Sequence, residues 1–254
     1  MSKLSLPKDK IRVLLLEGIH KNAVELFHRN GYGNVELLDH ALDADALKEK
    51  IADAHMVGLR SRTKLTKDVL GAAEKLMAIG AFCIGTNQID LATARHMGIP
   101  VFNAPYSHTR SVAELVIAEA VMLMRRIPEK NKLTHDGVWR KTATGANEVR
   151  GKVLGIVGYG HIGAQLSVLA EGMGMKVRYY DIVEKLPLGN AEPCRSLQEL
   201  LEVSDVVSLH VPATPQTEWM IKREHIQAMK PGGYLINASR GNVVEIEPLA
   251  EALK

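Results

Sequence analysis

Three glycines and one acidic residue in the middle of the chain have the types and spacing needed to bind a diphosphate-linked nucleotide. Gly158, Gly160 and Gly163 form a GxGxxG pattern, and Asp181 follows 23 residues after the first of them. The first glycine suits a tight turn, the second lets the main chain approach a pyrophosphate, and the third lets a helix pack closely on a strand. A carboxylate at Asp181 would accept hydrogen bonds from the ribose hydroxyls and repel a 2′-phosphate. The pattern therefore predicts a dinucleotide site that prefers NAD to NADP.

Such a site needs a strand before the glycines and a helix after them. The apolar run 153–157 predicts a buried strand, an apolar-periodic helix begins within the glycine pattern, and a second strand, 176–180, ends at Asp181. The start of the helix would offer N–H groups and the positive end of its dipole to a phosphate. Because all these parts are present in order, we favour a dinucleotide site over an ordinary glycine-rich turn.

The first hundred residues alternate short apolar strands with amphipathic helices, which is typical of a parallel sheet covered on both faces. The expected strands are 11–16, 35–38, 55–59, 77–82 and 99–103, and the expected helices are 21–30, 43–52, 67–75 and 91–97. Gly31 and Gly98 each follow a helix, where a residue with positive φ would end it. The sequence thus predicts an α/β domain with a doubly wound parallel sheet.

A different pattern follows residue 103. A polar linker leads to a long apolar helix, 112–127, which we expect to start with a capping box of Ser111 and Glu114 and to end at Pro128. Because this helix is apolar nearly all round, we expect it to be buried against a domain, a second subunit or both. The polar segment 129–150 has Trp139 as its expected anchor.

A second alternation of strands and helices begins at residue 152. After the glycine pattern we expect a helix at 197–203, a strand at 205–211, a helix at 223–229, a strand at 234–237 and a helix from Glu247. The fold class is therefore α/β with two doubly wound parallel sheets, in domains 1–105 and 106–254. Since the last helix has no following strand, we expect the sequence to be a piece of a longer protein.

Composition narrows the classes of function. The 254 residues carry a net charge of only +3, from 32 basic and 29 acidic residues spread along the chain, so no nucleic-acid partner is predicted. No run approaches the length of a membrane span, and the first apolar run is too short for a secretory signal. The two cysteines, Cys83 and Cys194, are too few for a disulfide framework or a metal site, which predicts a cytoplasmic location.

Three further stretches, together with the glycine pattern, resemble one family. They are RSRT at 60–63, NAPYSHTRSVAELVIAEAV at 103–121, and LHVP at 209–212 followed by MKPGGYLINASRG at 229–241. The whole chain resembles the D-isomer-specific 2-hydroxyacid dehydrogenases. RSRT and IGTNQIDL at 84–91 resemble the branch that acts on 3-phosphoglycerate.

The resemblance implies a flavodoxin-like substrate domain and an inserted Rossmann NAD-binding domain in a homodimer or homotetramer. It implies that NAD contacts Gly158, Gly160, His161, Ile162, Gly163, Asp181, Pro212, Ala238, Ser239 and Arg240. It also implies that Arg60, Ser61, Arg62 and Gly85 bind the substrate.

Arginine suits the catalytic position that the resemblance gives to Arg240. A 2-oxo acid presents a carboxylate and a carbonyl oxygen side by side, and a planar guanidinium binds such a pair in a forked geometry. It also stabilises charge that develops on oxygen as hydride moves. The alternative for Arg240 is a solvated loop cation.

Arg60 and Arg62 follow a predicted strand end and are two residues apart, so in an extended segment both side chains would lie on one face. Two cations there suit a substrate that carries a phosphate. The alternative is a pair of surface arginines without a ligand.

The family's acid/base histidine, its partner glutamate and an aspartate for the nicotinamide amide would lie after Lys254. The chain alone is therefore expected to be inactive, and we regard His161, His210 and His225 as non-catalytic. The resemblance implies NAD-dependent oxidation of 3-phosphoglycerate to 3-phosphohydroxypyruvate in serine biosynthesis. The alternatives are a hydroxypyruvate or glyoxylate reductase of the same family and a non-catalytic, NAD-sensing binding protein of the same fold.

Overall fold

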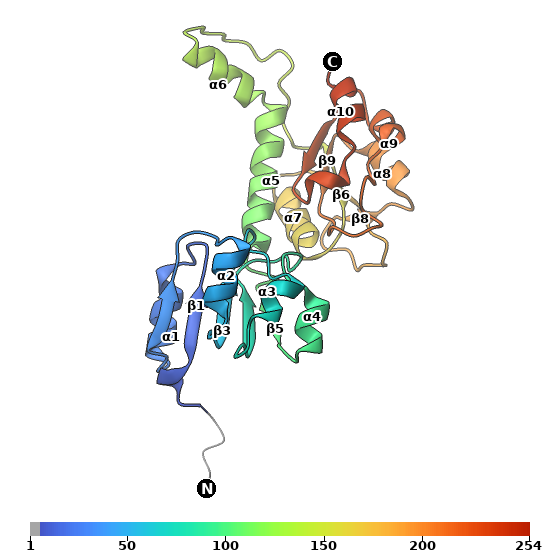
Figure 1. Cartoon of the computed structure of the whole chain (residues 1–254). Coiled ribbons are helices and arrows are strands. Elements are labelled where there is room, and N and C mark those ends of the chain that lie inside the picture. The colour runs from blue at the N-terminus through green and yellow to red at the C-terminus, as the bar shows by residue number, and fades with distance from the viewer. Residues whose placement is uncertain (1–5) are drawn as a thin grey trace. The chain divides into compact units, whose positions relative to one another are not determined.

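The computed structural model of the chain describes residues 6–254. The chain divides into two compact units, Met1–Ser107 and His108–Lys254. Each unit is built on its own parallel sheet of five strands (Figure 1). The predicted α/β class with two doubly wound sheets is confirmed. Within the described residues, no helix has both the length and the apolar character to cross a bilayer.

The sheet of the first unit has the strand order β2-β1-β3-β4-β5, which is the flavodoxin-like order. Its strands are β1 (Arg12–Leu15), β2 (Asn34–Leu37), β3 (Met56–Leu59), β4 (Ala78–Ala81) and β5 (Val101–Asn103). Each lies within two residues of its predicted bounds. The order reverses direction between β1 and β3, so ligands are expected at the carboxyl ends of these two strands.

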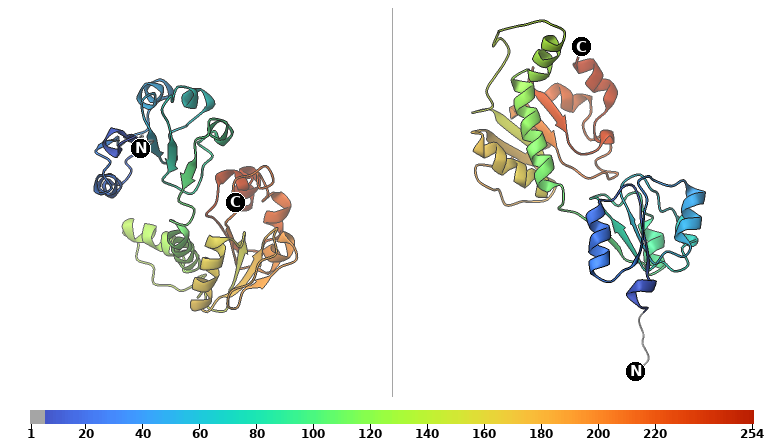
Figure 2. Two further views of the ribbon diagram at one scale, coloured as in Figure 1. Left: turned by 90° about the horizontal axis from the view of Figure 1, so that it is seen from below. Right: turned by 90° about the vertical axis from the view of Figure 1, so that its left-hand side faces the viewer.

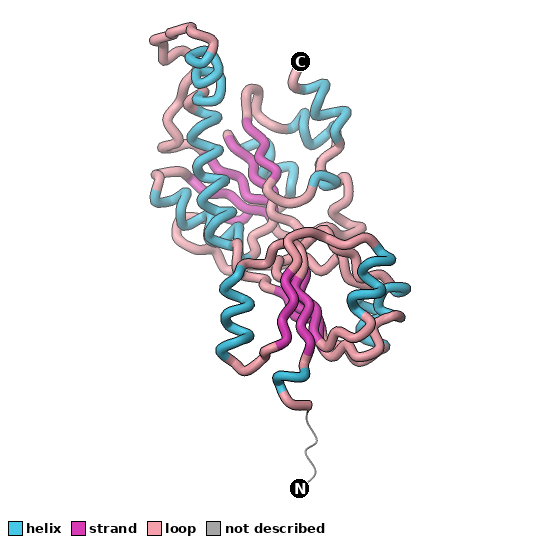
Figure 3. Tube along the Cα trace, turned by 60° about the vertical axis from the view of Figure 1, so that its left-hand side comes forward, coloured by secondary structure: helices cyan, strands magenta, loops and turns pink. Residues whose placement is uncertain are grey.

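Helices cover both faces of this sheet, as Figures 2 and 3 show. Alternate residues of β1 enter different cores: Val13 and Leu15 pack with α1, whereas Leu14 packs with α2 and α3. Gly31 and Gly98 have φ of 88° and 72°, which confirms the predicted helix ends. The helices are η1 (Lys8–Lys10), α1 (Lys21–Arg29), α2 (Ala44–Ile51), α3 (Lys67–Gly71) and α4 (Leu91–His96).

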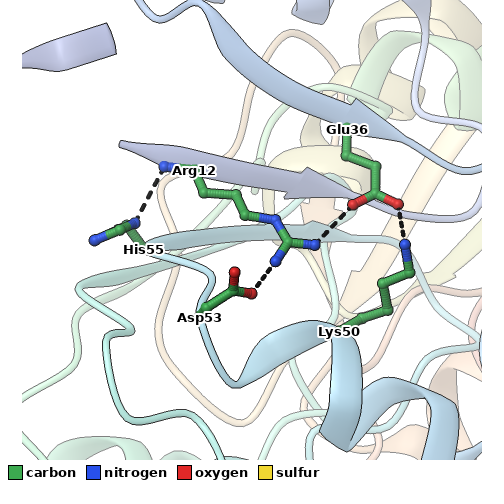
Figure 4. Close-up of polar contacts among 5 residues, drawn as sticks. All are labelled: Arg12, Glu36, Lys50, Asp53 and His55. Carbon is green, nitrogen blue, oxygen red and sulfur yellow. Dashed lines mark hydrogen bonds and ion pairs between the residues drawn. The ribbon is translucent and has the colours of Figure 1, made fainter. Parts of the chain in front are cut away.

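An ion-pair network joins β1 to its neighbours (Figure 4). The Arg12 guanidinium pairs with Glu36 of β2 at 2.9 Å and with Asp53. Lys50 of α2 pairs with the other oxygen of Glu36, and the backbone N–H of Arg12 donates to Nδ1 of His55 at 3.1 Å. The hydrogen bonds from Lys50 and then Arg12 hold the pKa of Glu36 below its ordinary value. These contacts tie β1, β2 and α2 to the segment that leads into β3.

The sheet of the second unit has the order β10-β9-β6-β7-β8. Its strands are β6 (Val153–Val157), β7 (Lys176–Tyr180), β8 (Glu192–Pro193), β9 (Val206–Leu209) and β10 (Tyr234–Asn237). The predicted bounds of β6, β7 and β10 are confirmed. The two-residue edge strand β8 has no apolar run and was not predicted.

Helices also cover both faces of the second sheet. Leu154 and Ile156 of β6 share a core with α5 and α7, whereas Val157 packs with α8 and with residues next to α9. The helices are α5 (Thr109–Met124), α6 (Ile127–His135), α7 (His161–Gly172), α8 (Leu197–Val203), α9 (Arg223–Ala228), η2 (Gly241–Val243) and α10 (Ile246–Ala252).

The predicted ends of α5 are wrong. The helix begins at Thr109, so Ser111 lies within it, and the residue before it, His108, makes no side-chain cap. Arg126 breaks the helix with φ of 55°, and Pro128 lies in the first turn of α6 instead of ending α5. Proline is tolerated in a first turn because its missing N–H has no partner there.

Within the single chain, this region is only partly buried. One face of α5 is buried within the unit through Ala113, Val116, Ala120 and Met124. Leu115 and Met122 remain 56% and 41% exposed. Trp139 is 81% exposed within this single chain, so it does not anchor the segment after α6 to the unit.

Candidate functional site

Four loops of the second unit leave neighbouring strands at the same edge of the sheet. β10, β9, β6 and β7 are adjacent and parallel, so their carboxyl ends lie side by side. The strand order reverses between β9 and β6, which is where open α/β sheets bind ligands. The predicted contact residues of the second unit all lie on these loops or at the start of α7.

Gly158 makes the turn out of β6. Its φ is 91°, and its N–H donates to the carbonyl of Tyr180 at 2.9 Å. A Cβ at Gly158 would lie 2.6 Å from the carbonyl oxygen of His210, which is backbone and cannot yield as a side chain would. Both the conformation and the space therefore require glycine here.

Gly160 and Gly163 expose the start of α7. Gly160 precedes the helix, and apart from its two neighbours in the chain no described atom lies within 4 Å of the position that a Cβ would take. His161 and Ile162 form the first turn. A Cβ at Gly163 would lie 2.3 Å from the carbonyl oxygen of Gly158, so only glycine lets the helix approach the loop so closely. This open, positively polarised helix end fits a pyrophosphate.

Asp181 is coupled to the glycine loop by its own hydrogen bonds. One carboxylate oxygen accepts from the N–H of Tyr159 at 2.8 Å, and the other accepts from the N–H of Val183 at 3.0 Å. A carboxylate can accept about four hydrogen bonds, so both oxygens keep capacity for ribose hydroxyls. The glycine loop and the acid therefore form one connected structure, which fits a nucleotide held at both its phosphates and its ribose.

Two tyrosines that the sequence reasoning missed fix this arrangement. The rings of Tyr159 and Tyr179 are stacked, with centroids 3.9 Å apart. The hydroxyl of Tyr159 bonds Ser167 of α7 at 2.7 Å and accepts from the N–H of Leu188 at 3.2 Å. Tyr159 could have been identified from the sequence, because it is the aromatic residue inside the GxGxxG pattern. Its hydroxyl joins the glycine loop to α7 and to the segment after Asp181.

The loop after β9 contains His210 and Pro212. The Nε2 of His210 bonds the hydroxyl of Ser208 at 2.8 Å, and its buried Nδ1 has no hydrogen-bond partner among the described residues. Burial lowers the pKa of His210 from 6.5 to about 4, so the ring is neutral at pH 7. Pro212 is exposed, and its carbonyl accepts from the hydroxyl of Thr217 at 2.6 Å.

The loop after β10 presents Arg240. Asn237 shapes the turn, because its side chain accepts from the N–H and hydroxyl of Ser239 and donates to the carbonyl of Arg240 at 2.9 Å. Ala238 is half-buried beside the core of the unit. The Arg240 guanidinium is exposed and bonds the carbonyl of Ser239 at 3.0 Å, with no carboxylate partner in the described chain. The cation is thus available to an anionic ligand.

The predicted substrate residues lie at the corresponding edge of the first unit. Arg60, Ser61 and Arg62 follow β3, and Gly85 lies in the loop after β4, which is the neighbouring strand. The chain bends at Ser61 and Arg62, so the expected extended conformation is wrong. Both arginines are exposed, and neither forms an ion pair within residues 6–254.

No cluster of three or more His, Cys, Asp or Glu residues suited to a metal ion occurs in the described part of the chain. Cys83 and Cys194 are free, and burial raises the pKa of the Cys194 thiol.

The fold and the site define an α/β protein that binds a dinucleotide. Residues 117–254 match the family described as "D-isomer specific 2-hydroxyacid dehydrogenase, NAD binding domain". This match covers more than half of the chain, which therefore belongs to that family and uses NAD as its cofactor.

Curated relatives match along the whole chain. It is 60% identical over 253 residues to D-3-phosphoglycerate dehydrogenase of Escherichia coli strain K12 and 57% identical to the protein of the same name from Haemophilus influenzae. Each match covers 100% of this chain but only 62% of the relative. D-3-phosphoglycerate dehydrogenase 1 of Saccharomyces cerevisiae is 53% identical over 96% of this chain and 52% of its own length.

Solved structures share the fold. The TT0316 protein of Thermus thermophilus superposes with a TM-score of 0.89 at 33% identity, covering 96% of this chain and 78% of that one. D-lactate dehydrogenase of Aquifex aeolicus, solved with NAD and lactic acid, has a TM-score of 0.81 at 28% identity, covering 95% and 73%.

Proposed function

We propose that this chain carries the NAD site and part of the substrate site of an enzyme that oxidises 3-phosphoglycerate to 3-phosphohydroxypyruvate in serine biosynthesis. The observation that carries this proposal is the 60% identity, along 253 residues, to a relative named for that substrate. Two exposed arginines without acidic partners in the described chain, at the first unit's ligand-binding edge, support it. A phosphorylated hydroxy acid supplies the anionic groups that these arginines would bind.

The second unit would bind NAD through the residues at its sheet edge. The exposed start of α7 would hold the pyrophosphate, and Asp181 would hold the adenosine ribose. Pro212, Ala238 and Ser239 would line the site beside these groups. When bound, NAD⁺ supplies the acceptor for the hydride that leaves the substrate's C2.

Arg240 would bind the substrate carboxylate and the oxygen on C2. Its exposed guanidinium has the fork of donors that this pair of oxygens requires, and Asn237 fixes the turn that presents it. As C2 loses hydride and the C2–oxygen bond becomes a carbonyl, Arg240 would hold this oxygen in place. The hydroxyl proton must pass to a base with a pKa nearer neutrality than that of His210, which is about 4.

Arg60 and Arg62 would bind the phosphate, with Ser61 and Gly85 beside them. Replacing Arg60 by alanine in the full-length protein removes one guanidinium but keeps the backbone N–H and carbonyl that hold the loop. We expect the dissociation constant for 3-phosphoglycerate to rise about 10- to 100-fold, because a hydrogen bond to a charged group contributes about 1.5–3 kcal/mol. Isothermal titration calorimetry with 3-phosphoglycerate and with D-glycerate measures both affinities.

Arg29→Ala is the matched control. Arg29 is an exposed arginine of the same unit, on α1, and it pairs with Glu25 of the same helix at 3.4 Å. Its loss should leave both affinities unchanged. Equal weakening of both ligands by Arg60→Ala would contradict the assignment of Arg60 to the phosphate and would favour a dehydrogenase for an unphosphorylated hydroxy acid.

We also propose that the protein assembles at least as a homodimer through α5 and resides in the cytoplasm. Leu115 and Met122 leave apolar surface on α5 that a second copy would cover. The free cysteines accord with a reducing compartment. Analytical ultracentrifugation of the full-length protein tests the assembly, and a monomer at micromolar concentration would exclude it.

A further inference from the structure

A buried glutamate lies beneath the loop that carries the two arginines. Glu17 follows β1 and is 9% exposed. Its Oε1 accepts from the backbone N–H of Arg60 at 3.1 Å and of Thr63 at 2.8 Å, and its Oε2 accepts from that of Arg62 at 2.9 Å. Both oxygens of one carboxylate are therefore bound to the short loop that follows β3.

A buried glutamine holds the same loop through its carbonyl side. Gln88 is 8% exposed, and its Nε2 donates to the carbonyl of Arg60 at 2.8 Å and to that of Gly85 at 3.1 Å. The same nitrogen lies 3.3 Å from the sulfur of Cys83. Gln88 therefore joins the loop after β3 to the loop after β4, the two loops that carry the proposed substrate residues.

The position of Glu17 indicates more than a stabilising contact. It lies at the end of β1, beside the end of β3, where the strand order reverses and ligands are expected. Its backbone has φ of 62°, which is uncommon for a residue with a side chain and is maintained by hydrogen bonds from Glu17 and Gly18 to the carbonyls of His40 and Leu38. Strained residues of this kind cluster at functional sites.

The charge state of Glu17 matches this arrangement. Burial alone would raise the pKa of its carboxyl, but hydrogen bonds from the backbone of Thr63, Arg62 and Arg60 outweigh that effect, and the pKa is lowered from 4.5. Glu17 is thus a carboxylate at neutral pH and accepts all three hydrogen bonds.

We propose that Glu17 and Gln88 are positioning residues for substrate binding. They act through the backbone of the loop: Glu17 fixes its N–H groups and Gln88 fixes its carbonyl at Arg60, so the side chains of Arg60 and Arg62 leave from a fixed main chain. A loop already held in its bound conformation loses less conformational freedom when it binds a ligand. This inference rests on the proposed function of the Arg60–Arg62 loop.

Glu17→Gln in the full-length protein tests the proposal. Glutamine has the same length, but its amide nitrogen would face N–H donors, so at least one of the three hydrogen bonds is lost. We expect the KM for 3-phosphoglycerate to rise about tenfold, by a larger factor than kcat falls, since a hydrogen bond to a charged group contributes on this scale. The affinity for NAD, which binds the second unit, should stay within about twofold of the wild type.

Hydrogen exchange reports the loop directly. The amides of Arg60, Arg62 and Thr63 should exchange faster in Glu17→Gln, whereas that of Ile79 in β4 should not change. Glu36→Gln is the matched control, because Glu36 is a half-buried glutamate of the same unit whose partners are Arg12 and Lys50 (Figure 4). It should lower the melting temperature without changing the KM.

The results of these measurements distinguish a failure of the positioning role from a failure of the proposed function. A wild-type protein that does not bind 3-phosphoglycerate would refute the function, and the inference with it. Wild-type binding combined with faster loop exchange and an unchanged KM in Glu17→Gln would refute the positioning role alone. If Glu17→Gln does not fold, Gln88→Met gives the second test, with the same rise in KM expected and an unchanged KM decisive against the proposal.

Discussion

Replacing Gly163 by alanine should damage both the fold and the NAD site of the second unit. The added Cβ would lie 2.3 Å from the carbonyl oxygen of Gly158 and 3.0 Å from Cγ2 of Ile156. The first of these contacts is backbone, so the start of α7 must move away from the glycine loop until the separation reaches at least 3.0 Å. Overpacking of this kind costs about 1–3 kcal/mol.

The same movement carries the N–H groups of α7 away from the position proposed for the pyrophosphate. A loss of about 1.4 kcal/mol weakens binding tenfold, so we expect the dissociation constant for NAD to rise at least about tenfold. The melting temperature should fall by about 2–4 °C for each kcal/mol lost. Differential scanning calorimetry and isothermal titration calorimetry on the purified chain measure the two effects.

Two other glycines of the same region separate stability from binding. Gly160→Ala adds a Cβ that meets no described atom within 4 Å apart from its chain neighbours, so the melting temperature should not change. NAD binding should still weaken, because the methyl group occupies the space that a pyrophosphate needs. Gly172→Ala, at the far end of α7, also has open space and should stabilise the helix by about 0.5–1 kcal/mol with NAD affinity unchanged. A Gly163→Ala protein that melts early but binds NAD normally would refute the coupling between helix packing and phosphate binding.

Two further predictions concern carboxylates of the second unit. Asp181→Ala removes the charge that repels a 2′-phosphate and the carboxylate that accepts from the N–H of Tyr159. The ratio of the NADP dissociation constant to the NAD dissociation constant should therefore fall about tenfold or more. An unchanged ratio in calorimetry would exclude Asp181 as the residue that selects NAD. The pKa of Asp205 is lowered from 3.8, because hydrogen bonds from the N–H of Val153 and from Lys230 outweigh burial, which alone would raise it. The ionised carboxylate therefore contributes its whole share of the free energy of unfolding above pH 3.8, and this contribution is lost as the pH falls through the lower pKa of the folded protein. In urea unfolding, the free energy of unfolding of Asp205→Asn should be about 1–2 kcal/mol below that of the wild type at pH 7. The difference should be smaller below pH 3.8. A difference that does not change with pH would contradict this prediction.

The sequence predicted the central strands well because β3, β6 and β9 are short, mainly apolar stretches of four or five residues. The bounds of β6, β7 and β10 are confirmed, whereas β8 escaped prediction because two residues carry no period. The ends of α5 were predicted wrongly because local rules compete: Ser111 and Glu114 have the spacing of a capping box, yet the helix extends to Thr109.

The local geometry of the glycines could be predicted from the sequence, because glycine has a distinct mechanical role at each of these positions. The space around Gly158 and Gly163 accords with the roles given to these glycines. Glu17 and Gln88 could not be found in this way, because their partners include backbone groups of Arg60, which lies 43 residues from Glu17 and 28 residues from Gln88 in the sequence. Burial of a single polar residue has no periodic signature in a sequence.

The hydrogen bond between Asp181 and the N–H of Tyr159 has a consequence for how cofactor preference can evolve in this scaffold. The residue that we propose selects NAD over NADP also accepts a hydrogen bond from the backbone of the glycine loop and so supports that loop. A lineage that exchanged this acid for a neutral or basic residue would lose that support in the same step. A change of preference would therefore be expected to require a compensating substitution that supplies a new acceptor for the orphaned amide.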